Sequence, residues 1–327
     1  MSRRIKIGVI RGGPSAEHDV SLATGAAVLA AIRTKLDEHY EAVDVIIDTN
    51  GMWSIDDQPV TPTQAFRYFD IAWNALHGTF GEDGKIQTLF ESHGIPFTGS
   101  GSLSSAIGMN KVLTKRALKD AGIKSPYSKE ILSANVRKNV HFETDALFTS
   151  FLFPAVIKPA TSGSSVGVSI VRTKEDIPAA LLAAAQHGDV VLVEEYIQGD
   201  EATCGVIDNF RGQKTYALPP IEIKPAHDFF DFHAKYSGQS EEIVPARFSS
   251  AIKAELEELA KRVHTLLGLR HFSRTDFMIH PRRGVYVLEV NTLPGMTEQS
   301  LIPKALRAVG SDLHELVHHI VQLEMGE

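Results

Sequence analysis

Two short runs near the C-terminal end of the chain carry side chains that suit metal chemistry. The runs are SRTDFMIH, residues 273–280, and GVYVLEVN, residues 284–291. A short turn separates them, which predicts a β-hairpin. Because side chains alternate along a strand, Arg274 and Asp276 share one face, and so do Glu289 and Asn291. The sequence therefore predicts two pairs of polar side chains on the hairpin.

The register of this hairpin decides what those side chains can do. A turn of two or four residues pairs His280 with Val285, which sets Asp276 opposite Glu289 and Arg274 opposite Asn291. Facing carboxylates destabilise a sheet unless a cation lies between them. Oxygen ligands beside a phosphate substrate favour Mg²⁺. The alternative is a solvent-exposed hairpin face whose charges pair with one another.

A glycine-rich loop, ATSGSSVG at residues 160–167, joins two expected strands. It lacks the Gly-Lys-Ser/Thr of a Walker A loop and the Gly-x-Gly-x-x-Gly that opens a dinucleotide-binding helix. Its backbone N–H groups around Ser164 would still suit a phosphate, with the positive charge of Lys158 nearby. The alternative is a plain flexible hairpin tip.

Two N-terminal residues suggest a small-molecule site. Glu17 lies in the first turn of an expected helix, directly after Gly12 and Gly13. A carboxylate there suits a cation such as a substrate ammonium, although it would equally favour the helix dipole. His77 follows a buried strand, where open α/β sheets form ligand crevices, although a lone histidine there is more often structural.

Several further residues are candidates for nucleotide or substrate contacts. Glu194 and Glu201 suit ribose hydroxyls or an adenine amino group, or are solvated strand ends. The long polar loop 226–245 contains Lys235 and Tyr236, and a loop of that length is usually functional or disordered. Gly295 follows the hairpin and can bring a backbone N–H close to a reacting oxygen.

The elements around these residues alternate between strand and helix. We expect strands near 5–10, 42–48, 70–75 and 96–98. We also expect a helix from Ala16 to Ile32, capped by Ser15, with an inner face formed by Val20, Ala23, Ala27, Val28 and Ala31. Further on we expect strands at 190–195, 202–207 and 214–218, and helices over 111–120, 176–186, 250–267 and 312–324. This order predicts an α/β protein with α+β character in parts. The first 100 or so residues form an open parallel sheet.

Composition excludes several classes of protein. The chain has 327 residues, a formal net charge of −7 and one cysteine, Cys204. It has no basic block typical of nucleic-acid binders, no pair of cysteines for a disulfide and no run of about 18 apolar residues that would span a membrane. No signal-peptide pattern precedes the first strand, so we expect a cytoplasmic protein.

Taken together, these motifs resemble the D-alanine–D-alanine ligases of the ATP-grasp superfamily. The resemblance runs nearly from end to end. It rests on long, ordered segments: GGPSAEHDVSL (12–22), ALHGTFGEDG (75–84), PFTGSGSLSSAIGMNK (96–111), KPATSGSSVG (158–167), AKYSG (234–238), SRTDF (273–277) and LEVNTLPGMTEQSLIP (288–303).

The resemblance implies an ATP-grasp fold with domains at 1–101, 102–195 and 196–327. It implies ligation of two D-alanine molecules at the cost of ATP, for peptidoglycan precursor synthesis, by a homodimer. ATP would be held by Lys111, Lys158, Glu194, Glu201 and Lys235. Two Mg²⁺ ions, or Mn²⁺ in their place, would be held by Asp276, Glu289 and Asn291.

The resemblance also implies roles at the substrate site. Glu17, helped by Ser164 and Tyr236, would bind the ammonium of the first D-alanine, with His77 nearby. Arg274 and the Gly295 N–H would support the reacting carboxylate and its oxyanion. Ser300 and the backbone of Leu301 would bind the second D-alanine.

The chain differs from the family pattern at a few positions, and other functions are possible alternatives to compare with it. Asn110 and His233 stand where Asp and Glu are frequent in the family, which affects lid contacts rather than the reaction class. Tyr236 resembles the dipeptide-forming members, whereas relatives that make D-alanyl-D-lactate typically have Phe there or a rebuilt loop. A ligase that joins D-alanine to D-lactate or D-serine is the alternative within this superfamily. A regulatory nucleotide-binding protein without turnover is disfavoured by the joint presence of the charged residues. A nicotinamide dehydrogenase is disfavoured by the missing glycine fingerprint.

Overall fold

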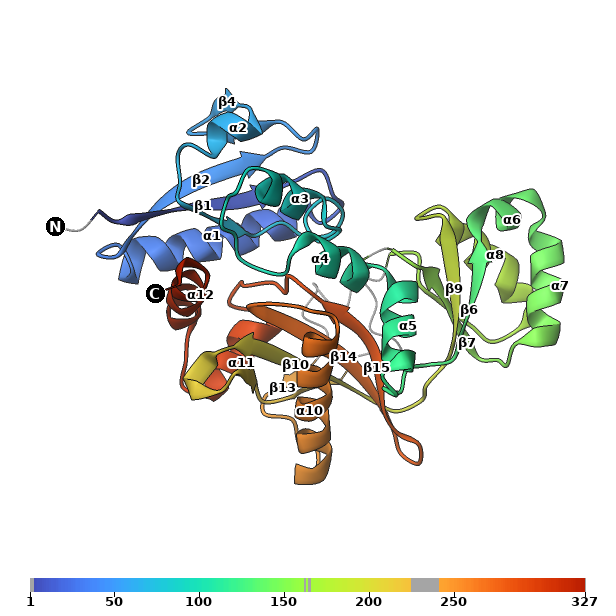
Figure 1. The fold of residues 1–327 in the computed structure, drawn as a ribbon. Helices are drawn as coiled ribbons and strands as arrows, with labels where there is room; N and C mark the ends of the chain where they lie inside the picture. Colours follow the sequence, from blue (N-terminus) through green and yellow to red (C-terminus); the bar gives the residue numbers. More distant parts are fainter. Residues whose placement is uncertain (1–2, 162, 164–165, 225–240, 327) are drawn as a thin grey trace.

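The computed structural model describes residues 3–161, 163, 166–224 and 241–326. Three β-sheets organise these residues, one after another along the chain (Figure 1). The first sheet lies beside the third, and the second stands to one side of both.

The N-terminal sheet has five strands in the order β4-β3-β2-β1-β5. Its strands are β1 (Ile5–Gly12), β2 (Tyr40–Ile47), β3 (Trp53–Ile55), β4 (Gln58–Val60) and β5 (Ile71–Asn74). The parallel pairing of β1 with β2 and β5 confirms the expected open parallel sheet. The antiparallel edge formed by β3 and β4 was not expected, because three-residue strands leave little periodic signal.

Helix α1 (His18–Lys35) corrects the expected limits and inner face of the first helix. It begins two residues later than expected. Ala23, expected inside, is exposed, whereas Ser21 and Gly25 are buried. Ser21 Oγ donates to the carbonyl of Ala75 (2.8 Å), and Gly25 leaves room for the Arg11 side chain, which would lie 2.5 Å from a Cβ atom there. Small polar residues can therefore form a buried face when a neighbouring strand supplies their hydrogen bonds.

The second sheet is antiparallel throughout, in the order β6-β9-β7-β8. Its strands are β6 (Ser128–Leu132), β7 (Ala155–Pro159), β8 (Ser169–Val171) and β9 (Val190–Glu195). It is covered by α6 (Ser133–Lys138), α7 (Val140–Ser150) and α8 (Ile177–Ala185), with a short 3-10 turn at Lys174–Asp176. The apolar side chains between sheet and helices form a core of their own.

The third sheet has six strands, in the order β13-β12-β10-β14-β15 with β11 paired to β10. Its strands are β10 (Asp200–Asp208), β11 (Thr215–Ala217), β12 (Ile221–Lys224), β13 (Glu241–Ile243), β14 (Phe272–His280) and β15 (Gly284–Asn291). Strands β14 and β15 form the expected hairpin.

The hairpin register was expected correctly at its functional end and wrongly at its turn. Asp276 pairs with Glu289, as expected, but His280 pairs with Gly284 rather than with Val285. The turn therefore has three residues, 281–283. A β-bulge compensates: Leu288 is the extra residue, and beyond it the pairing shifts by one.

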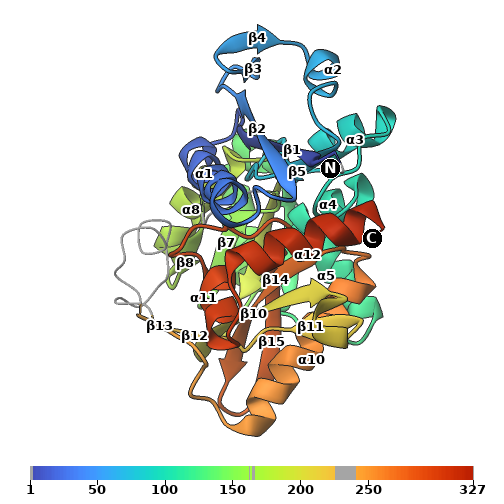
Figure 2. The same cartoon turned by 90° about the vertical axis from the view of Figure 1, so that its left-hand side faces the viewer.

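The remaining helices cover the first and third sheets. They are α2 (Pro62–Ala65), α3 (Lys85–Ser92), α4 (Ser102–Met109), α5 (Lys111–Asp120), α10 (Ser250–Leu266), α11 (Leu301–Ala308) and α12 (Leu313–Met325), with a 3-10 turn at Phe210–Gly212. Helix α12 packs against α1 (Figure 2). Tyr40 Oη lies 2.7 Å from His318 Nδ1 of α12. Within the described residues, we find no helix with the length and apolar character needed to cross a membrane.

One hydrophobic core is shared by the first and third sheets. Trp73 of β5 stacks on Phe272 of β14, with ring centroids 6.2 Å apart. The same core contains buried residues of α1, α11 and α12. The second sheet has a separate core, so the first and third sheets are joined more tightly to each other than to the second.

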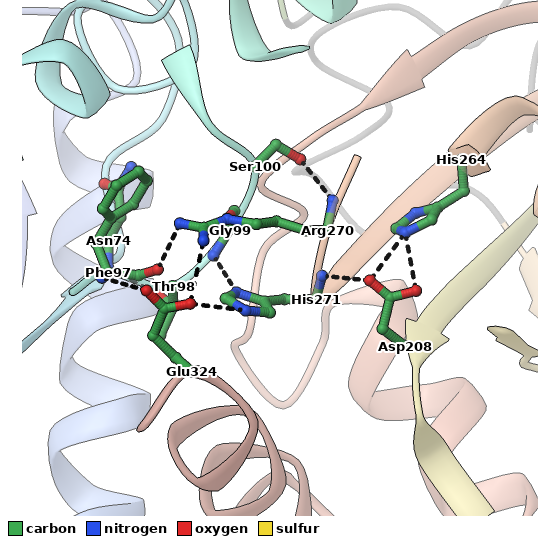
Figure 3. A network of polar contacts seen from close by, with 10 residues as sticks. All are labelled: Asn74, Phe97, Thr98, Gly99, Ser100, Asp208, His264, Arg270, His271 and Glu324. Atoms are coloured by element: carbon green, nitrogen blue, oxygen red, sulfur yellow. Dashed lines mark hydrogen bonds and ion pairs between the residues drawn. The ribbon is translucent and has the colours of Figure 1, made fainter. Parts of the chain in front are cut away.

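A polar network fastens the same junction (Figure 3). Arg270 donates to the carbonyls of Gly99 (2.8 Å) and Phe97 (3.1 Å) and to Glu324 of α12 (3.1 Å). The Gly99 N–H donates to Nδ1 of His271 (2.9 Å). These contacts hold the start of β14 against the N-terminal unit, three residues before Arg274.

Candidate active site

The paired carboxylate of β14 is buried and strongly bonded. Asp276 is 7% exposed. Its Oδ1 accepts from Thr203 Oγ1 of β10 (2.7 Å), and both of its oxygens accept from Arg274, at 2.9 Å each. The exposed-face alternative is therefore wrong for this residue, because Asp276 is buried and its charge is compensated by a cation and hydrogen bonds.

Its partner across the hairpin contacts a different cation. Glu289 Oε2 lies 3.1 Å from Nζ of Lys111, at the start of α5. Asn291 Oδ1 accepts from the N–H of Leu293 (2.9 Å). The two facing carboxylates are thus neutralised by two cations, Asp276 by Arg274 and Glu289 by Lys111. Among the described residues, no group of three His, Cys, Asp or Glu side chains is placed to hold a metal.

The oxygen set nevertheless fits Mg²⁺ when a phosphate substrate completes it. Two carboxylates and one amide oxygen from adjacent positions of paired strands are hard ligands, and Mg²⁺ is usually bound by one or two carboxylates together with phosphates. Arg274 and Lys111 are long side chains that can turn from the carboxylates to the substrate's own negative charge.

A second charged cluster lies in the second sheet. Glu194 of β9 is 2% exposed, and its oxygens lie 2.8 Å from Nζ of Lys158 on β7 and 3.1 Å from Nζ of Lys115 on α5. Burial alone would raise the pKa of Glu194, but the two lysines lower it overall. Glu194 is therefore held ionised between two cations, a cluster suited to keeping lysines aimed at phosphate.

Lys115 is a cluster member that sequence reasoning missed. Its pKa is lowered by burial, against the opposing charge of Glu194, and its Nζ also donates to the carbonyl of Pro126 (3.0 Å). Lys115 follows Lys111 by four residues on α5, and residues with that spacing share a helix face. That spacing was the signal that could have identified it.

A third group forms where the N-terminal unit meets the loop after β15. His77 Nε2 lies 2.9 Å from Thr24 Oγ1 of α1. A Cβ atom on Gly295 would lie 2.8 Å from Ser300 Oγ and 3.8 Å from Thr24 Oγ1. Residues separated by more than 200 positions therefore lie close together, and a side chain at position 295 would require Ser300 Oγ to move.

His77 is neutral in this environment. Burial lowers its pKa to about 4, against a hydrogen bond with the backbone of Leu293. A neutral imidazole both donates and accepts hydrogen bonds, so His77 bridges α1 to the loop that follows the hairpin.

Glu17 is placed beside this group, against Gly78. A Cβ atom on Gly78 would lie 2.6 Å from Glu17 Oε2, and one on Gly163 of the glycine-rich loop would lie 3.1 Å from the same atom. The glycine-rich loop and the N-terminal unit therefore approach each other at the Glu17 carboxylate, as an ammonium subsite enclosed by both would require.

Glu82 is a second carboxyl at this position, and sequence reasoning assigned it no role. It is 8% exposed, and its Oε2 accepts from the N–H of Gly78 (2.7 Å). Burial raises its pKa to about 8, and the negative charge of Glu17 adds to that effect. It lies in ALHGTFGEDG (75–84), one of the segments on which the family resemblance rests.

The other expected site residues are placed as follows. Glu201 is half-buried on β10, in the third sheet, whereas Glu194 lies in the second. Ser300 occupies the position before α11, with Leu301 as the first helical residue. Ser164, Lys235 and Tyr236, with His233, lie outside the described residues.

The chain matches two family models. The D-ala D-ala ligase N-terminus model matches residues 6–68 and 57–100, and the D-ala D-ala ligase C-terminus model matches residues 117–322.

Relatives match along nearly the whole chain. It is 39% identical to a D-alanine–D-alanine ligase of Geotalea uraniireducens over 97% of this chain and 94% of the relative. It is 40% identical to one of Geobacter sulfurreducens over 97% and 93%.

Two solved structures of ligases have the same fold as this chain. The VanG D-Ala:D-Ser ligase from Enterococcus faecalis superposes with a TM-score of 0.86 at 29% identity, covering 98% of this chain and all of the other. The D-alanine–D-alanine ligase from Bacillus anthracis complexed with ATP superposes with a TM-score of 0.80 at 31% identity, covering 98% and 97%.

Proposed function

The chain belongs to the D-alanine–D-alanine ligase family, and from this premise we propose that it joins two D-alanine molecules into D-alanyl-D-alanine. ATP is converted to ADP and phosphate in the reaction, and the product serves peptidoglycan synthesis. One observation carries the assignment to this site. The charge of Glu289 acts on the pKa of Lys158 in the buried Lys158–Glu194–Lys115 cluster, and the charge of Arg274 acts on the pKa of His77. The hairpin face that carries Asp276 and Glu289 therefore lies near both groups.

The nucleotide is proposed to bind on the side of the second sheet. Lys158 and Lys111 face its phosphates, and Glu194 and Glu201 contact its nucleoside portion, with Lys235 as a further phosphate contact. The buried ion pairs of Glu194 support this role, since they hold Lys158 in a fixed position before ATP arrives.

The metal site is proposed to be formed by Asp276, Glu289 and Asn291. Bound there, Mg²⁺ or Mn²⁺ would neutralise negative charge on the phosphoryl group during transfer. Arg274 and Lys111 would then pair with substrate oxygens instead of the carboxylates that they contact in this structure.

The first half of the reaction activates a carboxylate. Glu17, with Ser164 and Tyr236, holds the ammonium of the first D-alanine, and His77 lies at the edge of this subsite. Arg274 directs the substrate carboxylate at the γ-phosphate of ATP. Attack forms D-alanyl phosphate and ADP, so the residues of this chain act by position and charge.

The second half forms the peptide bond. Ser300 and the Leu301 N–H, at the start of α11, hold the carboxylate of the second D-alanine, as helix starts favour anions. Its amine, after losing a proton, attacks the acyl carbon, and the Gly295 N–H stabilises the oxyanion before phosphate leaves. Water must be excluded throughout, because it would hydrolyse the acyl phosphate.

The wider organisation follows the family resemblance. We propose three domains, at 1–101, 102–195 and 196–327, and a homodimer, which light scattering after gel filtration would test. Dependence on ATP favours a cytoplasmic location.

Product analysis tests the proposed function. The protein is incubated with ATP, Mg²⁺ and D-alanine alone or with D-serine or D-lactate, and products are identified by mass. We expect D-alanyl-D-alanine with one ADP released per dipeptide. A D-Ala:D-Ser ligase shares this fold. If the protein forms mainly D-alanyl-D-serine, the proposed second substrate is D-serine and not D-alanine.

Variants of the hairpin test the metal assignment. Asp276→Asn combined with Glu289→Gln removes both charges while keeping side-chain size. We expect ADP release to fall by at least about 100-fold, since positioned charge stabilisation commonly contributes that much. Near-normal turnover with unchanged Mg²⁺ dependence would contradict the assignment.

A further inference from the structure

Two carboxyl groups flank a single glycine at the expected ammonium subsite. The Gly78 N–H donates to Glu82 Oε2 (2.7 Å), and the Cα of the same residue lies against Glu17 Oε2, close enough that a Cβ atom would be 2.6 Å away. Gly78 has a φ of +70°, so its neighbours meet hydrogen rather than a side chain. Only the width of this glycine separates the two acidic groups.

The surroundings of Glu82 cannot easily accommodate two negative charges. Glu82 is 8% exposed, so water screens it poorly. The charged or titratable groups that face it are Glu17 at the start of α1, His77 on its own loop and Arg274 on β14. Arg274 is already bound through two hydrogen bonds to Asp276, and His77 is neutral. Two close carboxyls in such a site share one negative charge.

Resting on the proposed function, we propose that Glu82 is the second carboxyl of the ammonium subsite and releases its proton when the ammonium of the first D-alanine binds beside Glu17. The O–H bond of the Glu82 carboxyl breaks, its electron pair stays on the carboxylate, and the proton leaves to solvent. The ammonium keeps all three of its protons.

The physical reason is charge compensation. The negative charge of Glu17 raises the pKa of Glu82 and so favours its protonated form. The arriving cation stabilises a second carboxylate nearby, because an opposite charge favours the ionised form of an acid. The ammonium then lies beside Glu17 with the Glu82 carboxylate on the far side of Gly78, and the Gly78 N–H bonds more strongly to Glu82 once that group is charged.

The raised pKa of Glu82, about 8, places this exchange near neutral pH. The backbone of Leu293 hydrogen-bonds to both Glu82 and His77. Through Leu293 the proton change would reach the loop that carries Gly295, so Glu82 acts as a positioning residue for that loop.

Calorimetry tests the proton release directly. D-alanine is titrated into the protein saturated with Mg²⁺ and a non-hydrolysable ATP analogue, in buffers of different ionisation enthalpy. At pH 7 the wild-type protein should release up to about 0.9 proton per site, falling towards about 0.1 at pH 9, as expected for a group with a pKa of about 8. Glu82→Gln, which cannot ionise, should bind D-alanine without this release.

A matched variant separates the site from general effects. Glu91→Gln changes an exposed glutamate of α3 that accepts hydrogen bonds from Ser102, and it should keep the full release. Ionisation of D-alanine itself contributes equally to all proteins and cancels in the difference.

The outcomes distinguish two failures. Binding of D-alanine by the wild-type protein without proton release overturns the role of Glu82 alone, and so does equal release from Glu82→Gln. Absence of any D-alanine binding or ligation by the wild-type protein overturns the proposed function as well. If Glu82→Gln does not fold, the pH dependence of the wild-type protein tests the proposal instead. Proton release that does not fall between pH 7 and pH 9 would overturn it.

Discussion

Glu82 and Glu194 are buried to similar depth, at 8% and 2% exposure, and yet their pKa values move in opposite directions. Glu194 lies between Lys158 and Lys115, which hold it ionised. Glu82 lies beside Glu17, which favours its protonated form. Burial opposes charge in both places, so the neighbouring charges decide the outcome.

The difference corresponds to the two substrates proposed for the first half of the reaction, ATP and the first D-alanine. The cluster around Glu194 keeps two lysines in place on the side proposed for the ATP phosphates. The pair of Glu17 and Glu82 places two acidic side chains close together on the side proposed for the substrate ammonium. One residue type thus serves an anion on one side and a cation on the other, because the chain places it among different partners.

The largest effect is expected from Glu194→Gln. The change leaves two buried lysines without their counter-charge, and removing one partner of a buried ion pair commonly costs about 3–5 kcal/mol of stability. Urea unfolding at pH 7 should show a loss of this size, together with weaker ATP binding. A loss of less than about 1 kcal/mol would mean that the cluster is solvated.

A second change should partly reverse that loss. In Glu194→Gln combined with Lys115→Met, one of the two unpaired cations is replaced by an apolar side chain of similar length. We expect recovery of about 1–2 kcal/mol relative to Glu194→Gln, since contacting residues are not additive. Additive losses in the double variant would show that Lys115 and Glu194 do not interact in solution.

The pH dependence of stability should differ in sign between the two glutamates. The folded-state pKa of Glu194 is lowered, so its contribution is present above its unfolded pKa and is lost as pH falls through the folded value. The folded-state pKa of Glu82 is raised to about 8, so its contribution is present at low pH and is lost as pH rises from about 4.5 towards 8.

Glu82→Gln should therefore gain stability relative to the wild-type protein as pH rises. Between pH 5 and pH 8 we expect a relative gain on the order of 2 kcal/mol, measured by urea unfolding at several pH values. For Glu194→Gln the deficit should shrink on acidification instead. The same direction of change in both variants would contradict the assigned protonation states.

The smallest effect is expected from an exposed glutamate of the second sheet. Glu130 of β6 accepts from Arg116 with both oxygens, at 2.9 and 3.0 Å, and its side chain is 43% exposed. Glu130→Gln should change stability by less than about 1 kcal/mol, as exposed ion pairs usually do. A loss of stability as large as that of Glu194→Gln would show that the stability contributed by these glutamates depends on ion pairing and not on burial.

Sequence reasoning located the hairpin and its facing carboxylates because strand alternation is a local rule. It did not foresee the bulge at Leu288, since the three-residue turn and the bulge offset each other and leave the same final register. The inner face of α1 was misjudged for a different reason. Its buried Ser21 and Gly25 are selected by contacts with β1 and with Ala75, distant in sequence, rather than by apolar periodicity.

The candidate site was predictable where a residue acts through its own strand and unpredictable where it acts through a distant partner. Glu194 was identified as a strand-end carboxylate, but its pairing with Lys115 depends on where α5 packs. Glu82 was passed over because its significance comes from Glu17, 65 positions earlier, which reaches it only through the fold.

Infrared difference spectroscopy with isotope-labelled glutamate tests the opposite protonation of Glu82 and Glu194 most directly. Spectra of the wild-type protein at pH 7 are compared with those of Glu82→Gln and Glu194→Gln. Glu82→Gln should lose the band of a neutral carboxylic acid, and Glu194→Gln should lose only carboxylate bands. A carboxylate band lost from Glu82→Gln, or an acid band lost from Glu194→Gln, would contradict the account.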